Sequence, residues 1–188
     1  MYKLIVRPLP LDDAFAGRES ADDIAAAEGF APHRRREFLA WRSRVRRELG
    51  SAVPISYDAH GAPCVDCGVH IGVSHSRRMV AVCIGDSPCA VDTEPLDRDF
   101  GRVRERYIAA SESALSDDPR LSAALWCAKE TLYKLGGRAG TDFLRDIRIE
   151  SVDFASGRMA GTIHGGEEIR LAISYLDDNI VVSGEIGK

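Results

Sequence analysis

Two carboxylates two positions apart, Asp92 and Glu94, stand in a short segment rich in β-branched residues. On a strand, such residues point to the same face, so both carboxylates would project together. Adjacent carboxylates repel each other unless a cation lies between them, and oxygen ligands suit Mg²⁺. The pair is therefore compatible with a magnesium site, although taken alone it is a weak signal, because solvated carboxylates on an open sheet face are the commoner case.

A second group of reactive side chains falls between Leu121 and Leu135, where apolar residues recur at helical spacing. Trp126, Glu130 and Lys134 follow one another at i, i+4 and i+8 on the side opposite the apolar stripe. A solvated helix face does not usually carry tryptophan, so we expect another lobe or a ligand to cover this side. By helix geometry alone, an exposed and functionally silent ion pair between Glu130 and Lys134 is equally compatible.

Two further segments could bind an anion. Ser74-His75-Ser76, followed by two arginines, offers several hydrogen-bond donors to a phosphate, although a polar hairpin turn is the alternative. The segment from His33 to Leu49 holds many arginines, most of which suit a solvated face. Three of them border its apolar stripe, where an arginine usually has an anionic partner: Arg35, Arg42 and Arg46.

The elements that must position these groups follow from periodicity and from turn residues. Helical patterns occur from Ser20 to Gly29, from His33 to Leu49, and in pieces between Arg102 and Leu135. Strand patterns cover Tyr2–Arg7, Val69–Val73, Met79–Ile84, Cys89–Thr93, Ile147–Phe154, Arg158–His164, Ile169–Tyr175 and Ile180–Glu185. The three central strands are predicted to form one antiparallel meander. Helix followed by strands occurs twice, which predicts an α+β protein with two lobes that meet near residue 90.

Composition narrows the function classes. The chain has 188 residues, 45% of them hydrophobic, and a formal charge of -4, which disfavours nucleic-acid binding. No apolar run is long enough to cross a bilayer and no signal-peptide pattern is present, so we expect a soluble, intracellular protein that does not bind membranes. Five cysteines suggest reduced thiols. Cys64, Cys67 and His70 resemble half a zinc site, but ordinary thiols are the better interpretation because a second ligand pair at matching spacing is missing.

Taken together, the segments resemble a known family. Ser74-His75-Ser76, Ala90–Glu94 and Trp126–Lys134 resemble, in order and spacing, the three signature blocks of the 4'-phosphopantetheinyl transferases. The last block, W-[SC]-x-K-E-x-x-x-K, is the most specific. Phe38–Arg42 looks like the family's helix that ends in a coenzyme-A-binding arginine, and Asp58–Pro63 resembles its G-K-P turn.

The resemblance implies a fold of two similar lobes, each a small antiparallel sheet packed with a helix and related by a pseudo-twofold axis. Residues 1–90 would form the N-terminal lobe and residues 91–188 the C-terminal lobe, with the active site at the interface. It also implies the two-lobed, monomeric type that activates synthetases and synthases. Such an enzyme would be cytoplasmic and would use Mg²⁺, with coenzyme A as co-substrate, to load 4'-phosphopantetheine onto a serine of an apo acyl or peptidyl carrier protein.

The resemblance also implies roles for the residues of the C-terminal lobe. Asp92 and Glu130 would ligate Mg²⁺, with Glu94 as a third ligand or as the holder of a metal-bound water. Glu130 would be the general base for the carrier serine, and Lys134 would stabilise the pyrophosphate.

For the N-terminal lobe, the resemblance implies phosphate binding. Ser74 and His75 would contact phosphates, and Arg42 would meet the adenosine 3'-phosphate with Arg35 or Arg36 as helpers.

Two departures from the family pattern leave these groups intact. Ala90 replaces the usual glycine, and Ala62 replaces the lysine of the G-K-P turn, so one phosphate contact is absent. The alternatives are an inactive coenzyme-A-binding homologue, which loss of an acidic ligand would favour, and an unrelated Mg²⁺ phosphohydrolase, which would not need the W-x-x-K-E-x-x-x-K helix.

Overall fold

The computed structural model describes residues 1–10, 19–136 and 139–187. Its first half contains β1 (Tyr2–Pro8), α1 (Ala21–Ala26), α2 (Pro32–Leu49), β2 (Ile55–Tyr57), β3 (Pro63–Val65), β4 (His70–His75) and β5 (Met79–Gly85). Its second half contains β6 (Cys89–Pro95), the 3-10 helix η1 (Gly101–Arg106), α3 (Ala110–Ser113), α4 (Leu121–Gly136), β7 (Ile147–Asp153), β8 (Arg158–Ile163), β9 (Ile169–Leu176) and β10 (Asn179–Glu185).

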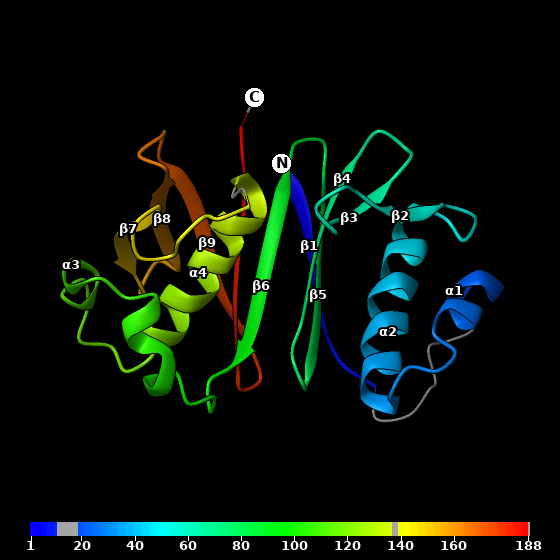
Figure 1. The fold of residues 1–188 in the computed structure, drawn as a ribbon, viewed down its shortest axis with the longest axis horizontal. Helices are drawn as coiled ribbons and strands as arrows, with labels where there is room; N and C mark the ends of the chain where they lie inside the picture. Colours follow the sequence, from blue (N-terminus) through cyan, green and yellow to red (C-terminus); the bar gives the residue numbers. More distant parts are fainter. Residues whose placement is uncertain (11–18, 137–138, 188) are drawn as a thin grey trace.

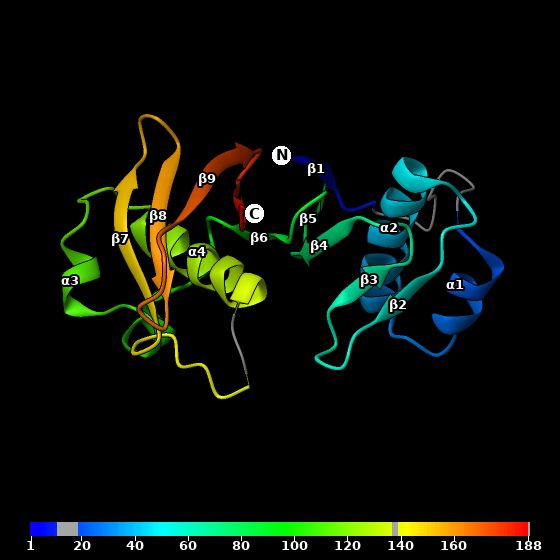
Figure 2. The same cartoon turned by 90° about the horizontal axis from the view of Figure 1, so that it is seen from above.

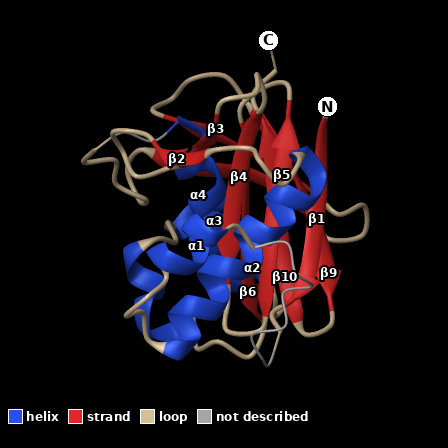
Figure 3. Ribbon diagram, turned by 90° about the vertical axis from the view of Figure 1, so that its right-hand side faces the viewer, coloured by secondary structure: helices blue, strands red, loops and turns tan. Residues whose placement is uncertain are grey.

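Each half combines an antiparallel sheet with one long helix. The first sheet has the order β1-β5-β4 and packs with α2, and the second has the order β6-β10-β9-β8-β7 and packs with α4 (Figure 1). Seen from above, the two halves stand side by side with β5 and β6 at their junction (Figure 2). Strands of both sheets run along a common direction (Figure 3). The predicted α+β class is confirmed, and the pseudo-twofold relation stays a prediction.

The two long helices form where the sequence predicts them. The apolar stripe of α4 is buried at Leu121, Leu125, Ala128 and Leu132. Helix α2 begins with Pro32, whose fixed φ suits a first helical position, and ends at Gly50, whose φ of 113° lies in the left-handed region. Among the helices of the described residues, none has both the length and the apolar character that crossing a bilayer requires.

The predicted three-strand meander is wrong at its third strand. Both edges of β5 are occupied, by β1 on one side and by β4 on the other. Strand β6 therefore joins the second sheet, where Asp92 pairs with Val182 of β10. The chain changes sheets between Gly85 and Cys89, so the expected boundary after residue 90 falls inside β6. The short hairpin of β2 and β3 is a further element that the sequence did not predict, because each strand has only three residues.

A glycine lets the two sheets approach closely at their junction. A Cβ atom on Gly72 of β4 would lie 2.6 Å from the Cys83 Sγ, 2.6 Å from the Cys89 backbone oxygen and 2.8 Å from the Ala90 Cα. Two of these neighbours are backbone atoms of β6, which cannot move without shifting the strand. The close packing of β4 against β6 therefore requires a residue without a side chain at this position.

We expect Gly72→Ala to destabilise the fold by about 1–3 kcal/mol because its methyl group overpacks this junction. Urea unfolding followed by circular dichroism measures the change. Gly187→Ala is the control, since a Cβ there meets nothing within 4 Å. An unchanged unfolding midpoint in Gly72→Ala would contradict the close approach.

A buried charge cluster fixes α1 against α2. Asp23 of α1 is 3% exposed, and its Oδ1 accepts hydrogen bonds from the Arg42 Nη1 at 2.9 Å and the Arg46 Nη2 at 3.1 Å. The Arg46 Nε donates to the Asp23 Oδ2 at 2.7 Å. Burial alone would raise the pKa of Asp23, but the hydrogen bond and charge of Arg46 and the charge of Arg42 outweigh it and lower the pKa.

We expect Asp23→Asn to lower the free energy of unfolding at neutral pH by about 3–5 kcal/mol, because both buried arginines lose their counter-charge. A carboxylate with a depressed folded-state pKa stabilises the fold above its unfolded pKa, and this contribution is lost as the pH falls through the folded pKa. The deficit of the variant should therefore shrink in acid, as measured by urea unfolding across pH. The exposed neighbour Asp22→Asn is the control, and a pH-independent deficit would contradict the assignment.

Candidate active site

Asp92 is the point at which both halves of the molecule meet. It lies on β6 and is 6% exposed. Its Oδ1 accepts a hydrogen bond from the Ser74 Oγ of β4 at 2.8 Å and one from the Lys134 Nζ of α4, also at 2.8 Å. Lys134 donates in addition to the Val91 backbone oxygen at 3.0 Å. Donors from β4 and α4 thus converge on one carboxylate of β6.

These contacts decide between the two interpretations of Lys134. In the part of the chain that the structure describes, the ion pair of Lys134 is with Asp92, 42 positions away, and not with Glu130 on its own helix. The Lys134 side chain is 31% exposed, so its ammonium group reaches Asp92 and still borders solvent. The exposed i, i+4 pair is therefore not formed.

The second oxygen of Asp92 is buried without a partner. Within the described residues, Asp92 Oδ2 is one of the few buried side-chain oxygens that accept no hydrogen bond. An unpaired buried carboxylate oxygen loses its hydration and gains nothing in return, which costs free energy. Such an atom is suited to accept a cation or a donor from a ligand.

Two more carboxylates lie within electrostatic reach of Asp92. Glu94, on the same strand, pairs with Arg98, whose guanidinium lies over the Trp126 ring at 4.6 Å. Burial, and after it the charge of Asp92, raises the pKa of Glu94 to about 7. Burial and the charge of Asp92 also raise the pKa of Glu130. The three acidic groups therefore share a region of negative potential.

The donor set suits a hard divalent cation in its chemistry. Oxygen atoms of carboxylates are the ligands that Mg²⁺ prefers, and the orphaned Asp92 Oδ2 offers one without breaking a hydrogen bond. Among the residues that the structure describes, no three His, Cys, Asp or Glu side chains are gathered closely enough to hold a metal ion as they stand. Lys134 and Arg98 neutralise Asp92 and Glu94 instead. The ligand set Asp92, Glu94 and Glu130 stays a prediction.

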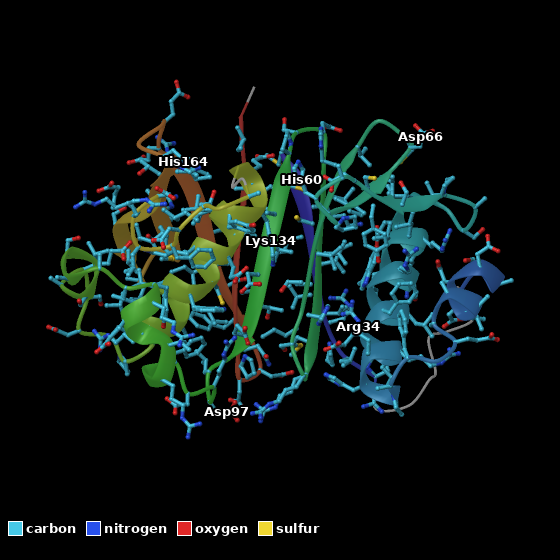
Figure 4. The ribbon with its side chains drawn as sticks, viewed as in Figure 1. Arg34, His60, Asp66, Asp97, Lys134 and His164 are labelled. Carbon is cyan, nitrogen blue, oxygen red and sulfur yellow. The ribbon has the colours of Figure 1, made fainter. Side chains whose placement is uncertain are left out.

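A pocket of about 330 Å³ opens beside Lys134. Figure 4 shows Lys134 of α4 and Arg34 of α2 on either side of the central strands, with His60 above them. The pocket is lined by Arg34, Trp41, Tyr57, Pro63, Val73, Ser74, His75 and Lys134. A second pocket of about 530 Å³ shares Pro63, Val73 and Lys134 with the first and includes the turn from Asp58 to Ala62. The two adjoin at the lysine that binds Asp92.

The predicted phosphate ligands separate into two sets. Ser74 and His75 line the smaller pocket, whereas Arg35, Arg36 and Arg42 are not part of its lining. Arg42 lies behind the aromatic residues of the pocket, with its guanidinium 4.8 Å from the Trp41 ring and 5.5 Å from the Tyr57 ring. Its anionic partner is Asp23. Contacts of these three arginines with a ligand stay predictions.

Arg34 is a charged pocket residue to which the sequence analysis assigns no role. Its Nη1 lies 3.2 Å from the Nε2 of His75, and its side chain is 56% exposed. A signal was present in the sequence, because Arg34 shares a helix face with Glu37 and Trp41 at i+3 and i+7. The predicted phosphate ligands Arg35 and Arg42 instead lie on the flank of the same helix that faces α1.

The two lysines of α4 have different environments. Lys129 is fully buried and its Nζ lies 2.8 Å from the Glu112 Oε1. It also donates to the backbone oxygens of Phe143 at 2.7 Å and Ile147 at 2.9 Å. Lys129 thus anchors the helix against the second sheet, and only Lys134 reaches the site.

Comparison with known proteins adds an independent finding. A comparison with curated proteins finds no match. A family model described as ACPS, 4'-phosphopantetheinyl transferase superfamily, matches residues 88–182, which is half of the chain. The matched segment includes Asp92, Glu94, Glu130 and Lys134, whereas the pocket residues of the first half lie before it. The chain belongs to the 4'-phosphopantetheinyl transferase superfamily.

Proposed function

We propose that this protein transfers 4'-phosphopantetheine from coenzyme A to a serine of an apo acyl or peptidyl carrier protein, in an Mg²⁺-dependent reaction that releases adenosine 3',5'-bisphosphate. The observation that carries the proposal is the environment of Asp92. One of its oxygens is held by Lys134 and Ser74, and the other is buried and unpaired, with the carboxylates of Glu94 and Glu130 within electrostatic reach. The pocket of about 330 Å³ next to Lys134, which Arg34, Ser74 and His75 also line, supports it.

Carboxylate oxygens are the ligands that Mg²⁺ prefers. Asp92 and Glu130 would hold Mg²⁺, with Glu94 as a third ligand or as the holder of a bound water. When bound, the metal would neutralise the pyrophosphate of coenzyme A as the phosphoanhydride bond breaks. Arg98 pairs with Glu94 in the structure. This ion pair would have to break before Glu94 could contact the metal or its bound water.

Glu130 is the residue we propose as the general base. Its carboxyl pKa is raised by burial and by the charge of Asp92, which makes it a better proton acceptor near neutral pH. It would take the proton of the carrier serine, directly or through water. The serine oxygen then forms a bond to the phosphorus that bears pantetheine, and the bond to the adenosine phosphate breaks. Lys134 would stabilise the charge that develops on the leaving phosphate.

Coenzyme A would extend from this centre along the pocket towards α2. Ser74 would contact the pyrophosphate because its hydroxyl lies next to Asp92. The adenosine 3'-phosphate would lie at the far end, between Arg34 and His75. Arg42 would support this end indirectly, because its guanidinium packs against the rings of Trp41 and Tyr57. Arg35 or Arg36, next to Arg34 in the same helix, would help to bind the phosphate. We further propose a two-lobed monomer of the type that activates synthetases and synthases in the cytoplasm.

Mass spectrometry of an apo carrier protein incubated with this protein, coenzyme A and Mg²⁺ should show the phosphopantetheine increment. Asp92→Asn and Glu130→Gln should each reduce the rate on the order of a hundredfold or more, because Asp92 would hold the metal and Glu130 would take the proton of the carrier serine. Asp97→Asn, an exposed carboxylate paired with two arginines, is the control. Coenzyme A binding without transfer by the parent protein would favour the inactive homologue instead, and full activity in either variant would remove that residue from the site.

Arg34→Ala should raise the KM for coenzyme A about ten- to a hundredfold, the equivalent of one charge-assisted contact, and leave the KM for 3'-dephospho-coenzyme A nearly unchanged. The reason is that the second substrate lacks the proposed partner of Arg34. Arg42→Ala should instead lower the thermal stability, because Asp23 loses a buried partner, and should change both KM values together. Arg47→Ala on the exposed side of α2 is the control. Discrimination by Arg42→Ala alone would make Arg42 the phosphate ligand.

A further inference from the structure

A buried carboxylate at the far end of the pocket has no part in the transfer step. Glu37 of α2 is 6% exposed. Its Oε1 lies 3.0 Å from the Nδ1 of His75 and 2.9 Å from the Nε2 of His33. Its Oε2 lies 3.9 Å from the Nη1 of Arg34. Glu37 therefore stands behind two of the residues that line the phosphate end of the pocket.

These contacts determine the tautomer of His75. A carboxylate only accepts hydrogen bonds, so the Nδ1 of His75 must carry the hydrogen that points to Glu37. A guanidinium only donates, so the Nε2 of His75, at 3.2 Å from the Arg34 Nη1, must present its lone pair. His75 is thus a neutral imidazole whose Nε2 accepts from Arg34.

The charges around His75 agree with a neutral ring. Burial lowers the pKa of His75, and the positive charges of Arg34 on α2 and Lys134 on α4 lower it further. The charge and the hydrogen bond of Glu37 act in the opposite direction. Without an anion in the pocket, burial and the two cations prevail.

A phosphate that enters the pocket reverses this balance. Its oxygens accept hydrogen bonds only, so they compete with Nε2 for the donors of Arg34. The lone pair on Nε2 would then face oxygen lone pairs unless the nitrogen gains a proton. A protonated His75 would donate to Glu37 through Nδ1 and to the phosphate through Nε2, with a negative group on each side.

We propose that Glu37 is a positioning residue that holds His75 by Nδ1, so that binding of the coenzyme A 3'-phosphate is coupled to uptake of a proton by Nε2. The inference rests on the proposed function, because it takes coenzyme A as the ligand. The proton comes from solvent, and no covalent bond changes. At a pH where His75 is neutral in the unliganded protein, the affinity for coenzyme A falls by up to about tenfold for each unit by which the pH rises.

Titration calorimetry tests the proposal at pH 8, where a phosphate monoester is fully ionised because its second pKa is about 6. Coenzyme A is titrated into the protein in buffers of different ionisation enthalpy, and the dependence of the observed heat on the buffer gives the protons taken up. We expect uptake approaching one proton for coenzyme A and essentially none for 3'-dephospho-coenzyme A. This comparison uses the unmodified protein and does not depend on the folding of a variant.

Variants then identify the residues. Glu37→Gln keeps an oxygen that can accept the Nδ1 hydrogen of His75 but removes the negative charge. The proton uptake should therefore fall towards zero, and the affinity for coenzyme A should fall about tenfold, as expected for the loss of one charge-assisted contact. Glu48→Gln, on the same helix and paired with Lys3, is the matched control. His75→Gln should abolish the uptake, whereas His33→Gln should keep it, because His33 contacts Glu37 without lining the pocket.

The outcomes separate the two proposals. If the parent protein fails to bind coenzyme A, the proposed function is overturned. If it binds coenzyme A with no more proton uptake than 3'-dephospho-coenzyme A, or if Glu37→Gln retains the full uptake, the role of Glu37 is overturned and the transferase proposal stands.

Discussion

The hydrogen bonds that Asp92 accepts through a single oxygen hold the candidate site together. Ser74 reaches this oxygen from the first sheet and Lys134 reaches it from the helix of the second half. The contact is possible only because Gly72 lets β4 lie directly against the start of β6. Since Asp92 is buried, the two donors compensate for its lost hydration on one side and leave the other oxygen available. Neither half could build this environment alone.

The orientation of α4 depends on a second buried interaction. Lys129 is held by Glu112, by the backbone oxygen of Phe143 and by that of Ile147, the first residue of β7. Removing a buried lysine from its partner would leave an uncompensated charge, so the helix has one favoured rotation about its axis. That rotation directs the apolar stripe into the core and turns Glu130 and Lys134 towards β6. A structural lysine and a site residue can therefore be neighbours in the sequence and face opposite environments.

Helix α2 divides its arginines between two tasks. One flank places Arg42 and Arg46 on Asp23, where they fix α1 and form part of the interior. The other flank presents Arg34 to the pocket, next to His75. The buried carboxylate of Asp23 satisfies the first pair, whereas the 56% exposed Arg34 keeps donors for a ligand. The positive charges of the buried arginines of α2 are thus neutralised by Asp23, whereas the charge of Arg34 remains available at the pocket.

The sequence by itself determined the two long helices, the longer strands and the carboxylate pair on β6, because these depend on periodicity and caps within a few residues. It also identified the family through its signature blocks. Tertiary structure decided that β6 leaves the first sheet, since β1 occupies the edge of β5 that a meander would need. It also decided that Lys134 pairs with Asp92 rather than Glu130, and that Arg34 rather than Arg42 lines the pocket. Such partners lie many residues apart, and local spacing carries no information about which distant group fills the space beside a side chain.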